Sequence, residues 1–549
     1  MVPWLAPWFL IRAGHEVDES GRFARFTDKR EVEAGLPTAL YEPRDVEASE
    51  LALPPYGDAS YCDENGDLWI DFVSDVGEGF SPTYTVAWLL SRPMLRLTCR
   101  ETTYETKRGR ILVLGGDQVY PSASWVKYRD RFVGPYTAAL PWVAEEAKAP
   151  HLFAIPGNHD WYDGLTCFMR VFCAGAWIGG WRTRQRRSYF ALRLSQQWWL
   201  WATDIQFDTY LDSPQLDYFH AAARSLQQDD RVILVTAKPS WVGAGTRKTE
   251  LMAAGSWETL SYVEENLVAR RGAKVAVTLT GDKHHYSRYA ANAGEFPEQR
   301  ITAGGGGAHT SATHGLPRSV DVPVHGSDRV ARYARQGVVS PPAEDSAQMR
   351  NRIVYRILTV GTMGLVISGI YLLVAGLMDV SWIAGTAVSV ALAGGLFAFA
   401  KAKQPAGLAR AAALGVVHAA AHVGAVLLLI LADFPLLLIA VLGYPVGLTI
   451  FGLYLLLANL TDANQHATEI FGGLASTEYK NFLRLQLKRD GSLAIYPVGI
   501  KSPPEWELRP EGAPDEPWFT AEGYDEERPE AKLLEPPISV SKPPPAPLG

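Results

Sequence analysis

Several side chains that could do chemistry follow runs of aliphatic residues, at the points where buried strands are expected to end. They are Asp75, Asp117, Asn158 with His159, Lys238, and Asp282 with His284. The carboxyl ends of parallel strands meet at one edge of an α/β sheet, where ligands collect. Carboxylates, amides and imidazoles are metal ligands, and several carboxylates in one crevice need cations to neutralise them. The pattern therefore predicts a metal site, which could supply hydroxide near neutral pH by lowering the pKa of bound water.

The elements that must position these residues are indicated by aliphatic runs and by the breaks after them. Buried strands are expected over residues 68–73, 111–114, 151–155, 232–236 and 275–280. A helix is expected over 84–97, and a pair of strands over 188–194 and 198–203. Gly115 and Gly116 separate the run ILVL from Asp117, so this carboxylate can approach a cation closely.

Read in order, these segments resemble the motif set of the purple acid phosphatases, within the calcineurin-like metallophosphoesterases. That set is DxG, GDxxY, GNH(D/E), VxxH and GHxH. The first three motifs are complete at residues 75–77, 116–120 and 157–160. In the fourth, Lys238 stands where histidine is expected, and in the fifth, Asp282 replaces the first histidine. The resemblance covers roughly residues 68–310.

The resemblance implies a four-layer α/β sandwich and a first metal ion, ferric in the family. This ion would be held by Asp75, Asp117, Tyr120 and His284, with the tyrosine as a phenolate ligand. All four residues are present. Which metal binds this chain, among Fe, Mn, Zn and Mg, is not predicted.

A second ion would share Asp117 and take Asn158 and two histidines, whose places Lys238 and Asp282 occupy. His159 would contact the phosphate or protonate the leaving group. Three interpretations stay open. Both sites fill, the second with a harder ion such as Mg²⁺ or Mn²⁺. Alternatively, one ion binds and the Lys238 ammonium takes the electrostatic role of the other. In the third, the site is degenerate and the domain binds without catalysing.

Composition sets bounds on the function. The chain has 549 residues and a net charge of −7, which argues against a general nucleic-acid binder. The four cysteines have no CxxC spacing, so neither a disulfide framework nor a cysteine zinc site is expected. Residues 1–14 are apolar and aromatic but have two prolines and no preceding basic region. They predict a packed or interfacial segment rather than a signal peptide.

Four uncharged stretches, 357–378, 380–400, 411–432 and 434–461, are each long enough to cross a bilayer as a helix. The basic residues around them are Arg350, Arg352, Arg356, Lys401, Lys403, Arg410, Lys480, Arg484, Lys488 and Arg489. They all fall on one side, so the positive-inside rule places both soluble parts in the cytoplasm. His418 and His422 share one face of the third helix, where a helix–helix hydrogen bond is expected.

The sequence thus predicts an α/β four-layer metallophosphoesterase sandwich joined to an all-α transmembrane domain of four helices. The expected divisions are 1–345 for the catalytic domain, 350–461 for the membrane domain, 462–501 for a β-hairpin segment and 502–549 for a Pro-rich disordered tail. The hairpin either completes the sheet of the first domain or stands alone. Glu78, next to the DxG motif, is not expected to assist a metal, and a structural or substrate-facing role is expected for His309 and His314.

The predicted function is hydrolysis of a phosphate ester by metal-bound hydroxide at the cytoplasmic face of a membrane. The substrate would be a phosphorylated small molecule or a lipid-linked phosphate, and the bilayer is the second partner. The alternative is a degenerate phosphoesterase-like domain that senses a ligand or acts as a scaffold on a membrane anchor. No oligomeric state is predicted.

Overall fold

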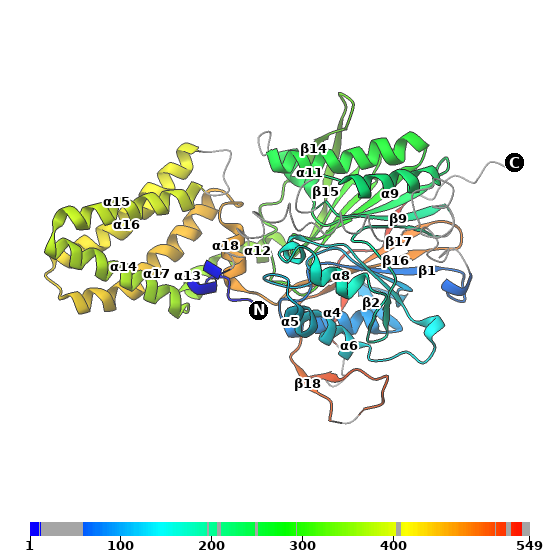
Figure 1. The fold of residues 1–549 in the computed structure, drawn as a ribbon, viewed down its shortest axis with the longest axis horizontal. Helices are drawn as coiled ribbons and strands as arrows, with labels where there is room; N and C mark the ends of the chain where they lie inside the picture. Colours follow the sequence, from blue (N-terminus) through cyan, green and yellow to red (C-terminus); the bar gives the residue numbers. More distant parts are fainter. Residues whose placement is uncertain are drawn as a thin grey trace.

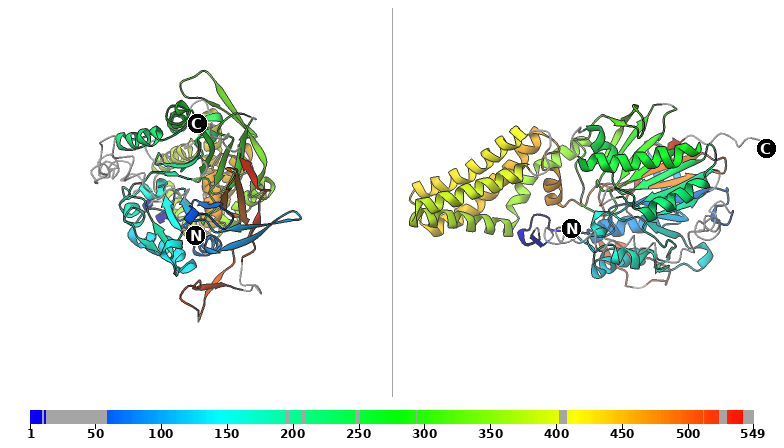
Figure 2. Two further views of the ribbon diagram at one scale, coloured as in Figure 1. Left: turned by 90° about the vertical axis from the view of Figure 1, so that its right-hand side faces the viewer. Right: turned by 45° about the horizontal axis from the view of Figure 1, so that its top comes forward.

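A computed structural model describes residues 1–9, 11–12, 59–194, 197–205, 210–246, 251–292, 294–401, 408–510, 512–522 and 529–540. An α/β body and a bundle of long helices lie end to end, and the N-terminus lies close to their junction (Figure 1). The right-hand view of Figure 2 shows the same separation.

The first sheet has the strand order β20-β17-β16-β1-β4-β5-β7-β6, with β21 paired to β17. Its strands are β1 (Leu68–Val73), β4 (Ile111–Leu114), β5 (His151–Ala154), β6 (Trp177–Ile178), β7 (Trp181–Thr183), β16 (Lys480–Leu487), β17 (Leu493–Ile500), β20 (Lys532–Leu533) and β21 (Ile538–Val540). Strands β1, β4, β5 and β7 are parallel. The hairpin of β16 and β17, which follows the four apolar helices in sequence, pairs antiparallel with β1.

The second sheet has the order β14-β15-β12-β13-β11-β10-β9-β8. Its strands are β8 (Phe190–Arg193), β9 (Trp198–Thr203), β10 (Arg231–Thr236), β11 (Lys274–Thr280), β12 (Tyr286–Ala291), β13 (Gln299–Ala303), β14 (Ser319–Pro323) and β15 (Val330–Ser340). Strands β9, β10, β11 and β13 are parallel. The predicted strand positions in both sheets are confirmed to within a few residues.

Three apolar cores divide the body into four layers. Successive residues of β1 face opposite sides: Ile70 and Phe72 join the core between the two sheets, and Trp69 and Val73 join the outer core of the first sheet. The outer helices of that sheet include α4 (Phe80–Ser91), α5 (Trp125–Tyr128), α6 (Gly134–Ala139) and α8 (Thr166–Phe172). The second sheet is covered by α9 (Ser213–Arg224), α10 (Ser240–Thr246) and α11 (Leu251–Tyr262). The predicted α/β sandwich is confirmed.

The helix predicted over 84–97 is wrong in its second half. Helix α4 begins at Phe80 and ends at Ser91, and a hairpin of β2 (Met94–Cys99) and β3 (Thr102–Lys107) follows. The reason is Pro93, which disfavours helical geometry at Arg92. The backbone of Arg92 is extended, with φ −69° and ψ 130°.

The prediction of a disordered tail over 502–549 is wrong for the part of it that the structure describes. Strands β18 (Trp506–Leu508) and β19 (Phe519–Ala521) pair with each other, and β20 and β21 extend the first sheet. Trp506 packs edge-on against Tyr84, with ring centroids 4.6 Å apart. Short strands at a sheet edge tolerate proline nearby, and these strands bury apolar side chains such as Leu533.

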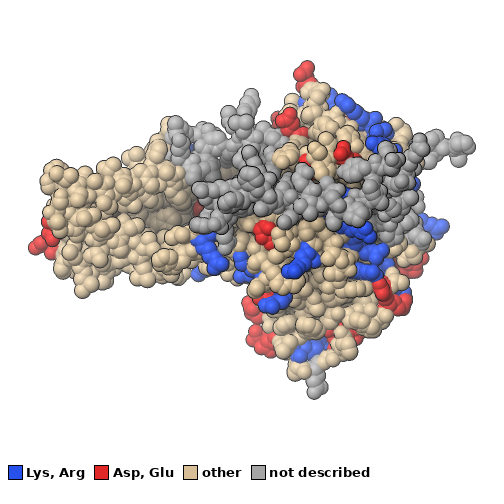
Figure 3. Space-filling view, in the orientation of Figure 1, with Lys and Arg blue, Asp and Glu red and all other residues tan. Residues whose placement is uncertain are grey.

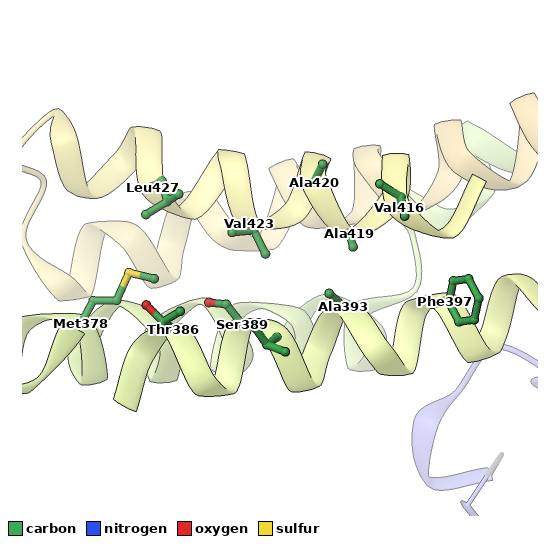
Figure 4. Close-up of a pocket in the computed structure, with 11 residues that line it drawn as sticks. Met378, Thr386, Ser389, Ala393, Phe397, Val416, Ala419, Ala420, Val423 and Leu427 are labelled. Carbon is green, nitrogen blue, oxygen red and sulfur yellow. The ribbon is translucent and has the colours of Figure 1, made fainter. Parts of the chain in front are cut away.

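The bundle contains α14 (Gly361–Val380), α15 (Trp382–Lys401), α16 (Leu408–Leu431) and α17 (Leu436–Thr461), each with a segment long and apolar enough to span a membrane. An apolar cavity of about 470 Å³ lies between α15 and α16, lined by residues such as Ala393, Phe397, Ala420 and Val423 (Figure 4). The expected helix–helix hydrogen bond is present: the hydroxyl of Tyr371 on α14 lies 2.9 Å from Nδ1 of His422 on α16.

Three short helices join the bundle to the body: α12 (Ala343–Asn351), α13 (Ile353–Leu358) and α18 (Ala467–Leu474). Two of the basic residues used to orient the chain are not at the surface. Lys480 and Arg484 belong to β16 and are fully buried. The basic character of this side of the bundle therefore comes from Arg352 and Arg356, which are exposed, and from the half-buried Arg350.

Candidate metal centre

Three aspartates at strand ends share an unusual backbone conformation. Asp75 follows β1, Asp117 follows β4 and Asp282 follows β11, with φ values of 59°, 53° and 62°. Left-handed geometry costs roughly 1–2 kcal/mol for a residue with a Cβ, and aspartate is among the few types that adopt it. β1 and β4 belong to the first sheet and β11 to the second, so the three aspartates lie at strand ends of both sheets. Backbone strain of this kind is characteristic of functional sites.

The hydroxyl of Tyr120 lies at the centre of this group. It is 2.9 Å from Oδ1 of Asp75, 3.3 Å from Oδ2 of Asp117 and 3.0 Å from Nε2 of His284. A phenol has one proton, so it can donate to only one of these three acceptors. The other acceptors need a proton or a cation from elsewhere.

The tautomer of His284 follows from its second nitrogen. Nδ1 lies 2.8 Å from the carbonyl oxygen of His309, and because a carbonyl only accepts, Nδ1 carries the proton of the neutral ring. Burial lowers the pKa of His284, which favours this neutral ring. Its Nε2 therefore presents a lone pair to the cluster, which is the arrangement found in histidines that bind metals.

Burial and mutual repulsion keep protons on the carboxyl groups. Burial raises the pKa of Asp75 well above its usual value, and the charges of Asp117 and Asp282 raise it further. Burial and the charge of Asp282 raise the pKa of Asp117 to about 7. Within the described residues, no group of three or more His, Cys, Asp or Glu side chains is arranged to hold a metal ion. The cluster described here has a tyrosine hydroxyl as its central group.

The side predicted for a second ion is crowded with positive charge. The Nζ of Lys283 lies 2.8 Å from Oδ2 of Asp282. Burial alone would raise the pKa of Asp282, but Lys283 and then Lys238 outweigh it and hold this pKa below its usual value. Asn158 lies at the start of α7 (Asn158–Trp161), where its amide donates to the hydroxyl of Tyr162. Two ammonium groups thus occupy the neighbourhood where the family resemblance places histidine ligands.

His159 is held at both its backbone and its ring. Its amide donates to Oδ1 of Asp117 at 2.9 Å, and its Nδ1 bonds the carbonyl of Pro121. Nδ1 therefore carries the ring proton, and Nε2 has none in the neutral form. Because burial lowers the pKa of His159, the neutral ring is favoured until an anion binds beside it.

Glu78 and His309 contact each other beside the centre. Oε2 of Glu78 accepts from the backbone amide of His309 at 2.7 Å and lies 3.0 Å from its Nδ1. The other carboxylate oxygen accepts from Nε1 of Trp4 at 2.7 Å. The positions of Trp4 and Lys283 were not predicted, because Trp4 belongs to no motif and Lys283 stands at the variable position of the fifth.

Glycines let the backbone approach these carboxylates. A Cβ on Gly157 would lie 2.1 Å from Oδ1 of Asp117, and one on Gly281 would lie 2.5 Å from Oδ2 of Asp75. Both positions therefore require glycine for steric reasons.

Replacing Gly157 with alanine should therefore displace Asp117 and destabilise the protein by about 2 kcal/mol or more. The measurement is the midpoint of thermal unfolding of the full chain in mild detergent. Gly337→Ala is the matched control, because a Cβ at that position on β15 meets nothing within 4 Å. Equal midpoints for the two variants would contradict the crowding described for Gly157.

Comparisons with known proteins do not assign the chain to a family. No protein-family model matches it, and no curated protein matches it. One similar solved structure is that of purple acid phosphatase PPD1 from yellow lupin (Lupinus luteus) seeds, with 10% identity and a TM-score of 0.30. The match covers 51% of this chain and 50% of the phosphatase, so the chain spans about half of its length. At this score, the likeness assigns neither a family nor an activity.

Proposed function

We propose that this chain is a membrane-anchored, metal-dependent phosphoesterase that hydrolyses a phosphate ester on the cytoplasmic side. The observation that carries the proposal is the shared position of the Tyr120 hydroxyl, within hydrogen-bond distance of two carboxylates and one unprotonated imidazole nitrogen. Two carboxyl groups and an imidazole lone pair meet at one phenol hydroxyl, and a cation could bind this donor set in place of its acidic protons.

The donor set fits a metal ion. Asp75, Asp117, Tyr120 and His284 would hold it. Burial first, and then repulsion between carboxylates, raises the pKa of Asp75 and of Asp117, and a cation would offset both effects. A bound ion of this kind lowers the pKa of a bound water and so supplies hydroxide near neutral pH. Iron, manganese, zinc and magnesium are all compatible with oxygen and imidazole donors.

The charges beside Asp282 favour one ion over two. Lys238 and Lys283 both lower the pKa of Asp282, so they already balance the carboxylate that a second ion would use. In this interpretation their ammonium groups attract and orient the phosphate. His159, with Nδ1 held by Pro121, presents an unprotonated Nε2 that would accept a hydrogen bond from a water or a protonated phosphate. A bound phosphate dianion would raise the pKa of this ring and allow it to donate to the leaving group.

The test is to measure metal content and hydrolysis in the same preparation. Full-length protein in mild detergent would be loaded separately with Fe, Mn, Zn or Mg and assayed with an aryl phosphate. Bound metal with metal-dependent turnover is expected. Metal or phosphate binding without turnover would favour the ligand-sensing alternative, and no metal binding under any loading condition would overturn the proposal.

A prediction for Lys238 follows from the one-ion interpretation. Replacing it with histidine removes a positive charge and adds a ligand of the type the resemblance implies, so the metal content per chain should rise. The matched control is Lys274→His, at a partly exposed lysine on β11 whose Nζ lies 3.7 Å from Asp229. Unchanged metal content in the Lys238 variant would count against a second ion site at that position.

A further inference from the structure

The N-terminal segment (residues 1–9 and 11–12) connects the candidate metal centre to the bundle. The Trp4 ring packs edge-on against two rings at the centre, with centroids 6.0 Å from His159 and 5.9 Å from His309. Val2 is buried against Tyr120 and Ala308. The segment therefore forms one wall of the centre.

The residue after Trp4 faces the membrane helices. Leu5 is buried in an apolar cluster with Ile353 and Ile357 of α13 and with residues of α17 and α18. Its contact with α18 is close: a Cβ on Gly473 would lie 2.5 Å from Cδ1 of Leu5. The neighbouring residues Trp4 and Leu5 thus contact the candidate metal centre and the end of the bundle, respectively.

The loop after β13 makes a second connection between the same two places. The carbonyl of His309 bonds Nδ1 of His284 in the centre. A few residues later, Nε2 of His314 lies 3.2 Å from Oδ1 of Asn459 near the end of α17. The centre therefore lies on the side of the body that faces the bundle.

The same junction carries exposed apolar side chains, here called the interfacial patch: Trp8, Ile11, Tyr355 and Leu358. Trp8 is 70% exposed, Ile11 66% and Tyr355 77%. Leu358 ends α13, and α14 begins at Gly361, so Tyr355 and Leu358 lie where the first membrane-spanning helix begins. The N-terminal segment, which has Trp8 and Ile11, lies near the same junction (Figure 1). Lys and Arg side chains gather at this junction, whereas the visible surface of the bundle beyond it has almost no charge (Figure 3). Aromatic and basic side chains at the end of a spanning helix are typical of the bilayer interface.

From this arrangement, we infer that the substrate is a lipid phosphomonoester, taken from the bilayer surface into a centre that the interfacial patch holds against the headgroups. The inference rests on the proposed function. The ammonium groups of Lys238 and Lys283 suit a dianionic monoester. In the reaction a water oxygen forms a bond to phosphorus, the phosphorus–oxygen ester bond breaks, and the leaving oxygen takes a proton. The products are a lipid alcohol and inorganic phosphate.

The experiment uses the full-length, metal-loaded protein in phosphatidylcholine vesicles. Release of inorganic phosphate would be compared for phosphatidate in the vesicle and for glycerol 3-phosphate in solution. The two substrates have the same phosphomonoester, so the ratio of their kcat/KM values measures the combined effect of the acyl chains and the bilayer. We expect the ratio to favour phosphatidate by about a hundredfold or more.

The variant Trp8→Ser/Ile11→Ser changes only exposed side chains of the patch, and it should lower this ratio about tenfold. Trp142→Ser is the matched control, because Trp142 is also exposed (54%) but belongs to the loop after α6, and it should leave the ratio unchanged. Equal rates for the two substrates, or a ratio that the double variant does not lower, would overturn the inference and leave the phosphoesterase proposal standing. If neither substrate nor an aryl phosphate is hydrolysed, both fail.

Discussion

Replacing Asp117 with asparagine should lower phosphate ester hydrolysis by about a thousandfold and, at the same time, stabilise the metal-free protein above pH 7. Activity should fall because this carboxylate is one of the four proposed metal ligands. It also accepts a hydrogen bond from the backbone amide of His159 and so positions that residue. The fold should persist, because asparagine tolerates the left-handed conformation, its Oδ1 can still accept from the His159 amide, and its Nδ2 can donate to the Tyr120 hydroxyl oxygen.

The effect on stability has a defined dependence on pH. The pKa of Asp117 is about 7 in the folded protein, and it is about 3.9 in an unfolded chain. Between these values the folded state binds a proton that the unfolded state lacks, so wild-type stability falls as the pH rises from about 4 to about 7. Asparagine does not ionise, so the variant does not lose stability in this way as the pH rises. The advantage of the variant should therefore be a few kcal/mol above pH 7 and should vanish below about pH 4.

Thermal unfolding of the metal-free full chain, measured at several pH values, would check this. Asp321→Asn is the control, because that aspartate is exposed on β14 and its pair with Arg332 is long, at 3.7 Å. Metal should stabilise the wild type more than the Asp117 variant. A variant that is less stable than the wild type at every pH would show that Asp117 is a structural carboxylate.

Replacing Arg484 with methionine should have the largest effect on stability, a loss of about 3–5 kcal/mol. Arg484 on β16 forms a bidentate pair with Asp71 on β1, with Nε to Oδ1 at 2.7 Å and Nη2 to Oδ2 at 3.2 Å. Both side chains are almost fully buried. Without the guanidinium, the Asp71 carboxylate keeps only the backbone amide of Gly109 as a donor among these described contacts.

Arg96→Met is the matched control. In the Arg96–Glu105 pair, Nε lies 3.0 Å from Oε1, a distance similar to those in the Arg484–Asp71 pair, but both side chains are more than half exposed. Solvent screens such a pair, and its loss should cost less than about 1 kcal/mol. In the double variant Asp71→Leu/Arg484→Met, much of the stability should return because no buried charge is left unpaired. Equal losses for the Arg484 and Arg96 variants would show that β16 is not held by this pair.

The sequence predicted the parts of the centre that depend on short segments. Asp75, Asp117 and His284 each follow a largely apolar strand, and such strands are expected to be buried, with their ends at one edge of a sheet. Tyr120 was found through its motif. The sequence alone could not show that its hydroxyl would be surrounded by three acceptors.

Local sequence patterns could not predict contacts between distant parts of the chain. Trp4 meets Glu78 across 74 residues, and no periodicity marks either one as a partner. The hairpin of β16 and β17 was predicted as a hairpin, but whether it pairs with β1 depends on which strand edge is open in the finished sheet. Lys283 gave no signal because an isolated lysine in a loop is usually solvated. The tail was misjudged because composition does not show where short edge strands can bury their few apolar side chains.

The position of β16 within the first sheet has a consequence for biosynthesis. Asp71 and Arg484 are 413 residues apart, and all four membrane helices are translated between them. At typical rates of synthesis, β1 waits on the order of half a minute for its neighbour. During this time the body is an incomplete sandwich with an open edge, which needs protection from aggregation. The ribosome finishes the α/β body only after it has synthesised the four long apolar helices, so the proposed metal centre can mature only after these helices have been made.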